Sequence, residues 1–334
     1  MPTTYTHDTF GKLIYQKLPT DVRELLMNHK NSFLIGLHGP DLLFYYHPLK
    51  KNPVSQRGQE MHQEIAAPFF EKCKEYYMET GDEEALAYVI GFICHYMLDS
   101  TCHPYIGRYM EKTGAGHDEI ETELDRYFME RANKNPFRLK PAAHLKASRE
   151  STRAISAILG LPEKTVRKCI RSLRFYTGVT VGGGLKRAIL LQGMRLLGVY
   201  SSLQGQIMRK KPLKRCAEST GELVSLFKLA VPETLTVIED FYDTLEERGY
   251  LNGRFGRNYE QKIKKYAHYP DKGKDAKAAD GERDRLPAAI NLTDGKCAYC
   301  VKQCFCFVWR QFCFLSGRWR HRRKISNCTP SMPS

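Results

Sequence analysis

The sequence predicts an all-α fold. Apolar residues recur at helical spacing along most of the first 250 residues, whereas runs that alternate between apolar and polar residues are few. The alternation of strand and helix that is typical of a parallel sheet is not found. With 334 residues, of which 42% are hydrophobic, the chain can bury a substantial core. We therefore expect one multi-helix domain followed by an irregular C-terminal tail.

The first expected helices lie before residue 80. Residues 4–30 are typical of helix, because apolar side chains follow His7 at helical spacing. A Gly-Pro-Asp turn ending at Asp41 interrupts the next apolar run. Asp41 is placed to cap a short helix and point inward, and capping is the simpler explanation for it. Residues 60–80 are expected to form a single helix with His62 near its start.

The central expected helix covers residues 85–104, which are apolar on nearly every side, as in a buried helix. His95, Asp99 and His103 interrupt it at intervals of four residues, so a helix places them in one stripe. Pro104 is expected to limit the helix and to leave His103 in its last turn or just beyond. A buried carboxylate is costly unless it is paired. We favour metal ions on either side of Asp99 over the alternative of satisfied core histidines and a capping aspartate.

Another helix is expected to begin at about His117. His117 and Glu121 are one turn apart and share a face. A histidine and a carboxylate at this spacing can hold a metal ion between them. The alternative is an ordinary acid in a first turn, favoured by the helix dipole; this would explain Glu121 but not His117.

The remaining helices are expected in more basic segments, at 141–160, 163–176, 185–215 and 218–248. Residues 185–215 contain eight Lys and Arg residues and no acid. Such a segment would suit a membrane surface. A core helix with a solvated basic face is more common, and we expect that arrangement here.

Charge is unevenly distributed along the chain. Residues 1–130 carry 12 bases and 20 acids, and residues 131–259 carry 24 bases and 10 acids. The acidic part contains the metal-type residues, as cation binding requires. The basic part would favour an anionic surface, either lipid headgroups or nucleic acid. No secretory signal and no run of 18 apolar residues is found, so we expect a cytoplasmic protein without a membrane-spanning helix.

The composition changes after about residue 259. The following residues are rich in Lys, Asp, Ala and Gly, and six cysteines come later without helical or strand periodicity. We expect a catalytic domain at 1–258 and a basic, Cys-rich, disordered tail at 259–334.

Taken in their order along the chain, the motifs resemble those of the bacterial zinc-dependent phospholipase C family. That family is similar in fold and metal site to the fungal zinc-dependent single-strand nucleases. The resemblance covers roughly residues 4–257. The motifs that carry it are Thr6-His7, Gly39-Pro40-Asp41, His62, His-x3-Asp-x3-His at 95–103, and His-x3-Glu at 117–121.

The resemblance implies a multinuclear site of two to three zinc ions. One ion would be held by Asp41, His62 and His95, with Asp99 bridging it to a second ion beside His7, and the third would be held by His103, His117 and Glu121. Asp41 is also the family's candidate for general base.

The implied activity is hydrolysis of a phospholipid by zinc-activated water, releasing diacylglycerol and a phosphorylated headgroup. Peripheral contact with an anionic membrane would accompany it. Two alternatives remain: a single-strand nuclease on the same site, with nucleic acid a less expected partner than phospholipid, and a non-catalytic, membrane-associated protein that keeps zinc structurally.

Overall fold

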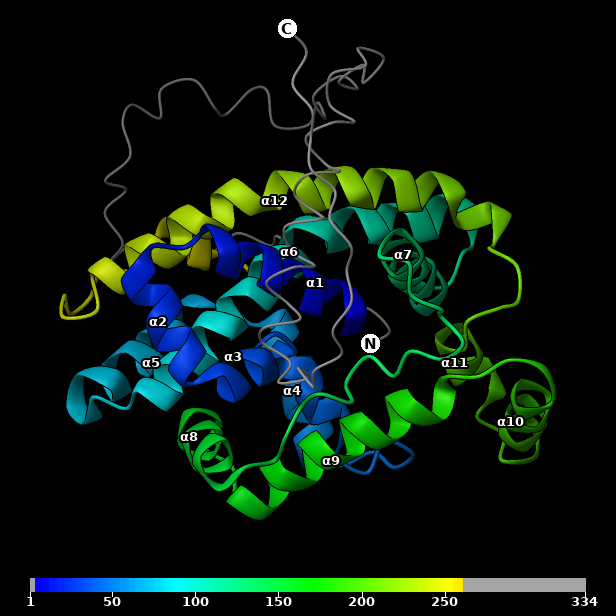
Figure 1. Cartoon of the computed structure of the whole chain (residues 1–334), viewed down its shortest axis with the longest axis horizontal. Helices are drawn as coiled ribbons and strands as arrows, with labels where there is room; N and C mark the ends of the chain where they lie inside the picture. Colours follow the sequence, from blue (N-terminus) through cyan, green and yellow to red (C-terminus); the bar gives the residue numbers. More distant parts are fainter. Residues whose placement is uncertain (1–3, 261–334) are drawn as a thin grey trace, which may run out of the picture. The chain divides into compact units, whose positions relative to one another are not determined.

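The structure is a computed structural model, and it describes residues 4–260 (Figure 1). Within this part of the chain it contains helices and no β-strand, so the predicted all-α fold is confirmed. From residue 261 onward, the expected tail lies outside the described residues. The α-helices are α1 (Thr4–Lys17), α2 (Thr20–Asn28), α3 (Lys30–Gly36), α4 (Pro53–Gln63), α5 (Ala67–Thr80), α6 (Glu83–Thr113), α7 (His117–Arg131), α8 (Arg149–Leu159), α9 (Glu163–Thr180), α10 (Gly184–Leu196), α11 (Tyr200–Leu203) and α12 (Ala217–Asp243). Short 3-10 helices are η1 (Gly39–Tyr45), η2 (Gln204–Gln206), η3 (Lys214–Cys216) and η4 (Gly253–Gly256).

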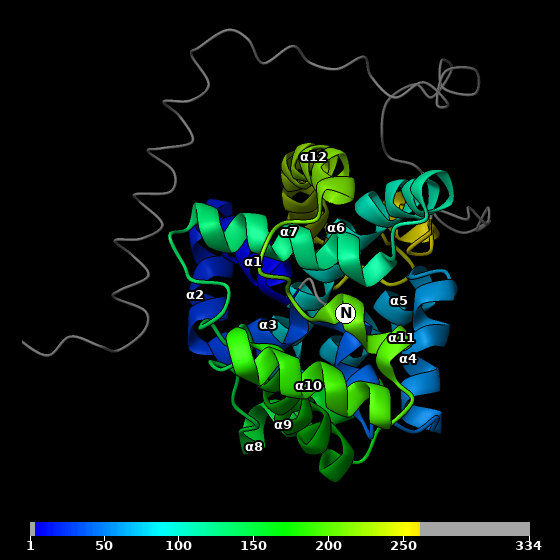
Figure 2. The ribbon, with the colours of Figure 1, turned by 90° about the vertical axis from the view of Figure 1, so that its right-hand side faces the viewer.

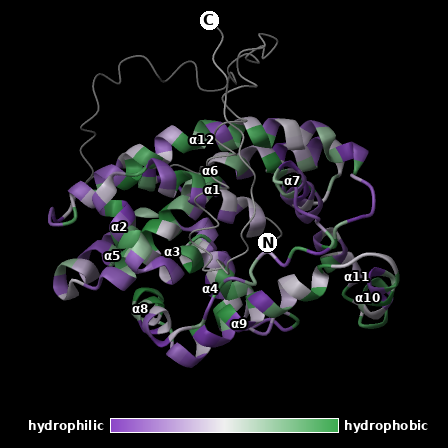
Figure 3. Ribbon diagram, viewed as in Figure 1, coloured by the Kyte–Doolittle hydropathy of each residue, from purple (hydrophilic) through white to green (hydrophobic). Residues whose placement is uncertain are grey.

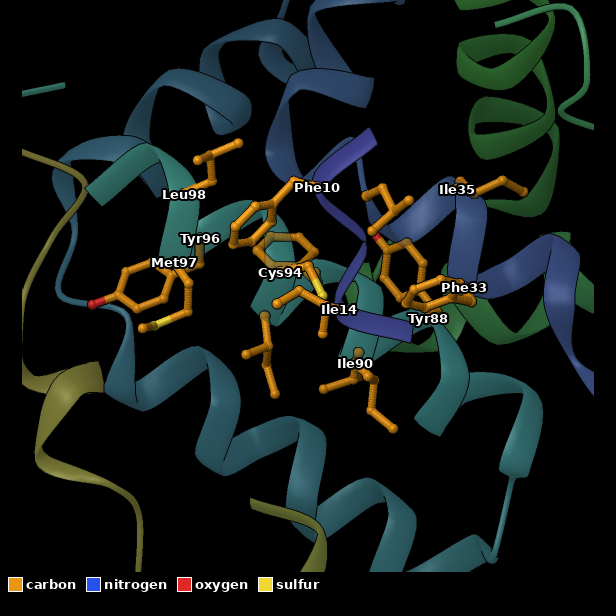
Figure 4. Close-up of a cluster of buried hydrophobic side chains, with 14 of the residues drawn as sticks. Phe10, Ile14, Phe33, Ile35, Tyr88, Ile90, Cys94, Tyr96, Met97 and Leu98 are labelled. Atoms are coloured by element: carbon orange, nitrogen blue, oxygen red, sulfur yellow. The ribbon is translucent and has the colours of Figure 1, made fainter. Parts of the chain in front are cut away.

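Helix α6 forms the centre of this assembly and packs against α1, α3, α8 and α12. It is long and apolar enough to cross a membrane by composition alone, but 94% of its apolar window is buried in the protein, as in a core helix. Figure 4 shows how side chains of α1 and α3 meet those of α6 in the core. The labelled residues are Phe10, Ile14, Phe33, Ile35, Tyr88, Ile90, Cys94, Tyr96, Met97 and Leu98.

Helix α6 continues through Pro104 to Thr113, so the expectation that Pro104 limits the helix is wrong. A proline inside a helix removes one hydrogen bond and costs about 3 kcal/mol. The extra turns bury Ile106 and Tyr109, and burying a large apolar side chain stabilises by roughly 1.5–3 kcal/mol. Two such side chains offset the proline. His103 therefore stays on the helical stripe.

The expected helix at 60–80 is divided in two. Helix α4 ends at Gln63 and α5 begins at Ala67, with Pro68 in its first turn. Proline fits a first turn, where its missing N–H has no intrahelical partner in any case, but disfavours an interior position. His62 therefore lies in the last turn of α4 rather than near the start of a long helix.

Helices α3 and α6 approach closely at two glycines, Gly36 and Gly91. A Cβ on Gly36 would lie 2.2 Å from the carbonyl oxygen of Tyr88, and one on Gly91 would lie 2.2 Å from that of Phe33. Only glycine permits this spacing without moving the backbones apart. The crossing fixes the position of α6 one turn before His95.

The basic segments also differ from expectation. Helix α8 begins at Arg149, so the first part of the 141–160 segment is not helical. Residues 185–215 are not one helix, and α10 has only Met194 buried, so the expected core helix is wrong there. Figures 1 and 2 place α10 at the outer edge of the described helices.

Candidate metal centre

The eight candidate ligands come from five elements that meet around one stretch of α6. Local helical spacing places those within α6 and within α7, whereas packing of the elements brings the others to them. The residues are His7 on α1, Asp41 on η1, His62 on α4, His95, Asp99 and His103 on α6, and His117 and Glu121 on α7.

The side chain of Asp99 lies at the centre and is buried. Its Oδ1 is 3.0 Å from His7 Nε2, and its Oδ2 is 3.1 Å from His95 Nε2 and 3.7 Å from His103 Nε2. Because His7 lies at one carboxylate oxygen and His95 and His103 lie at the other, Asp99 has the geometry of a bridging ligand. Burial raises the pKa of Asp99, but the His103, His95 and His7 imidazoles outweigh it and hold the pKa well below its usual range.

A second pair is formed by Asp41 and His62, whose Oδ1 and Nε2 atoms are 3.2 Å apart. His62 Nδ1 donates a hydrogen bond of 2.7 Å to the carbonyl oxygen of Gly58, so the lone pair of the neutral ring is on Nε2. Asp41 lies in the first turn of η1, and His38 rather than Asp41 holds the N-cap position there. Among the described residues Asp41 therefore makes no capping bond, and its carboxylate faces the histidines.

The third group is formed by His103, His117 and Glu121. Glu121 Oε1 is 3.0 Å from His117 Nε2 and 3.8 Å from His103 Nε2. The Glu121 side chain is only 4% exposed, whereas that of His117 is 39% exposed. The centre thus has its most open edge at the start of α7, where a substrate would enter most easily.

These side chains form three groups whose ligand atoms all lie within 4.8 Å of one another inside each group. The groups are His7, His95 and Asp99; Asp41, His62 and His95; and His103, His117 and Glu121. Zinc bonds to nitrogen and oxygen of about 2.0–2.2 Å place two tetrahedral ligands about 3.3–3.6 Å apart. The closest donor pairs in the groups are near this separation.

The residues fit zinc. His95 is fully buried; among the described residues its Nδ1 has no hydrogen-bond partner, and its Nε2 lies 3.1 Å from Asp99 Oδ2 without the geometry of a hydrogen bond. An unpartnered polar atom in a core is costly, and a metal ion is one group that would satisfy it. Imidazole and carboxylate are the donors that zinc takes in proteins.

Sequence reasoning gave no supporting role at this centre to two residues that have one. Asp125 of α7 accepts hydrogen bonds from the N–H groups of Tyr5 and Thr6, at 3.2 and 2.8 Å, and so caps α1 just before His7. Its place on the stripe one turn beyond Glu121 is the signal that could have identified it. Gly39, with φ +44°, lies so close to His95 that a Cβ would be 2.2 Å from the ring; nothing in the sequence marks that contact.

Residues 6–170 match the family described as zinc dependent phospholipase C. The match contains all eight candidate ligands, from His7 to Glu121. Residues 6–170 belong to the zinc-dependent phospholipase C family. The family match ends within α9, short of the 4–257 span over which the motifs resemble it. No curated protein and no solved structure matches the chain. Family membership supports a zinc-dependent hydrolase as the general kind of function.

Proposed function

We propose that this chain hydrolyses the phosphodiester of a phospholipid, in the manner of a phospholipase C, to release diacylglycerol and a phosphorylated headgroup. The observation that carries the proposal is the convergence of three ligand groups on Asp99 and its neighbours within the family segment. Two to three zinc ions would occupy these groups.

The residues would divide the work by position. One ion would lie among Asp41, His62 and His95, a second beside His7 and Asp99, and a third among His103, His117 and Glu121. Zinc bound in such a site lowers the pKa of water and offsets negative charge on a phosphoryl group.

Asp41 is our candidate for the catalytic carboxylate. Burial raises its pKa, but the hydrogen bond that a protonated His62 donates from Nε2 outweighs this and keeps the pKa below its usual range, so the side chain is ionised at neutral pH. A metal ion on Nε2 would take the place of that proton. An ionised carboxylate at this partly exposed position would orient the attacking water and accept its proton. The Gly58 carbonyl would keep His62 in the tautomer that this arrangement needs.

The test uses the purified full chain and two variants, Asp99→Asn and Asp21→Asn. Asp21 is an exposed aspartate in the first turn of α2 and belongs to none of the three ligand groups. We expect wild type and Asp21→Asn to hydrolyse a chromogenic phosphocholine ester and phosphatidylcholine, and to lose this activity in a chelator. Asp99→Asn should lose at least one bound zinc and at least about a hundredfold in kcat/KM, as is typical when a transition-state contact is removed.

A single-stranded oligonucleotide is the comparison substrate. Faster turnover of the oligonucleotide than of either lipid ester would reject the phospholipase activity in favour of a nuclease. Bound zinc without hydrolysis of any substrate would leave only a structural role for the metal. Full activity of Asp99→Asn would remove the bridging role from the proposal.

A further inference from the structure

Helix α10 presents an apolar stripe to solvent. Leu185, Ile189 and Leu196 are 76%, 63% and 80% exposed. Their spacing of four and seven residues places them on one side of the helix. In Figure 2 the helix faces the viewer, and Figure 3 marks hydrophobic residues on it.

The opposite side of α10 is also apolar. Met194 is buried there, and Leu190 and Leu191 are half-buried. A surface helix that had only the protein to pack against would carry polar residues on its outward side. Three large aliphatic side chains gathered on an outward stripe are instead typical of a surface that binds something.

Charge indicates what that partner is. At about 100° per residue, Lys186 lies on one flank of the stripe and Arg195 on the other, and both are exposed. Residues 185–215 add six further bases and contain no acid. A second copy of the chain would set this basic segment against itself, and residues 260–334, with 16 bases and 7 acids, are also basic. Like charges so placed repel, which leaves an anionic partner.

We propose that α10 docks on the surface of an anionic phospholipid membrane. Leu185, Ile189 and Leu196 enter the boundary between headgroups and acyl chains, while Lys186 and Arg195 contact the headgroup phosphates. This apolar stripe with basic flanks is the arrangement of a helix that lies in the plane of a membrane surface.

The chain after α10 connects this surface to the metal centre. Gln206 donates a hydrogen bond of 3.1 Å to Asp118, and Arg209 forms an ion pair of 3.2 Å with Glu119. Both acids lie in the first turn of α7, which begins with His117, the most exposed of the ligand histidines. Docking through α10 would therefore anchor, on the membrane, the segment that lies against the open edge of the centre. This last step rests on the proposed function, but the docking itself does not.

The test measures binding to vesicles of phosphatidylcholine alone and of phosphatidylcholine mixed with phosphatidylserine, with the full chain throughout. The variant replaces three residues, Leu185→Ser, Ile189→Ser and Leu196→Ser. The matched control is Leu229→Ser on α12, where the leucine is 60% exposed. Wild type and control should prefer the anionic vesicles and lose binding as salt rises. The triple variant should bind them at least roughly tenfold more weakly, because it loses the transfer of three apolar side chains.

Two further readouts separate docking from catalysis and folding. The triple variant should keep wild-type zinc content and wild-type hydrolysis of a soluble phosphocholine ester. The proposal is overturned if wild type ignores the anionic vesicles, or if the triple variant binds them as tightly as wild type. It is also overturned if the substitutions abolish self-association in light scattering and leave vesicle binding unchanged, because α10 would then be an interface between copies.

Discussion

Glu84, in the first turn of α6, links this helix through its carboxylate to α3, to α8 and to the junction between α2 and α3. His29 Nδ1 lies 2.6 Å from its Oε2, and the hydroxyls of Ser32 and Ser151 donate to its Oε1 at 2.5 and 2.9 Å. Burial raises the pKa of Glu84, but these hydrogen bonds outweigh it and hold the pKa below the ordinary 4.5. Burial lowers the pKa of His29, but Glu84 and Glu83 outweigh that and raise it above 6.5.

These opposite shifts define a pH window. The Glu84 contribution to stability is present above pH 4.5 and is lost as pH falls through the lowered pKa of the folded state. The His29 contribution is present below pH 6.5 and is lost as pH rises through its raised pKa. The charged pair therefore stabilises the fold most between about pH 4.5 and 6.5.

We expect Glu84→Gln to lower the free energy of unfolding by about 1–3 kcal/mol inside this window and by less on either side. Thermal unfolding by circular dichroism across the pH range measures this, with a chelator present so that bound metal does not contribute. Glu83→Gln is the control: Glu83 pairs with the same histidine but is 57% exposed, so its loss should cost little. A cost for Glu84→Gln that does not vary with pH would contradict the linkage.

At the scale of helices, the α3–α6 crossing offers a sharper test. Gly91→Ala would place a methyl group 2.2 Å from the Phe33 carbonyl oxygen, so the two helices would have to separate. We expect a loss of about 1–3 kcal/mol, as for other overpacked cores. The zinc affinity should also fall, because His95 lies one turn further along α6.

Gly107 on the same helix is the matched control, since a Cβ there meets no atom of the described residues within 4 Å. Alanine has the higher helix propensity, so Gly107→Ala should stabilise by up to about 1 kcal/mol. Urea unfolding of both variants gives the comparison. Equal stability of the two would mean that the crossing is not as close as the structure has it.

Helix spacing explains how much of the site could be predicted. The stripe of His95, Asp99 and His103 follows from local periodicity, and so does the pairing of His117 with Glu121. That His7 lies at the opposite oxygen of Asp99 depends on how α1 packs on α6, which no local pattern contains. The motif order supplied that contact only through the resemblance.

The same distinction explains the errors in the elements. Pro104 disfavours helix locally, but buried residues beyond it stabilise the continuation. Pro68 also disfavours the interior of a helix, but no helix continues through it, and it lies in the first turn of α5. For α10 a core helix was expected ahead of the membrane-surface alternative, because periodicity shows that a helix has an apolar face but not which face the protein covers.

At the scale of the molecule, the ligands of the metal centre come from five elements, which are α1, η1, α4, α6 and α7. A bound metal would therefore link parts of the chain that are far apart in sequence. Any group that binds the folded chain and not the unfolded one adds its binding free energy to stability. Without metal, burial raises the pKa of Glu121, but attraction to neighbouring positive charge, including His117, outweighs burial and holds the pKa well below its usual range. The buried Glu121 carboxylate therefore stays ionised beside His117. The apolar core that surrounds α6 is built from side chains other than these ligands. The metal-free protein should therefore stay folded but be less stable.

We expect chelation to lower the Tm of the full chain while the transition stays cooperative. A ligand at a hundred times its Kd stabilises by about 2.7 kcal/mol, and each kcal/mol shifts the Tm of a domain this large by about 2–4 °C, so the fall should be about 5–10 °C.

Adding zinc back should restore the Tm, whereas magnesium should not, because histidine nitrogens suit zinc and magnesium prefers oxygen ligands. Differential scanning calorimetry of wild type and Asp99→Asn, each with and without chelator, separates the metal's effect from that of the fold. The variant lacks the shared carboxylate, so its Tm should respond less to chelator. A wild-type Tm that ignores chelator, or that magnesium restores as well as zinc, would mean that these side chains hold no zinc that matters to the folded state.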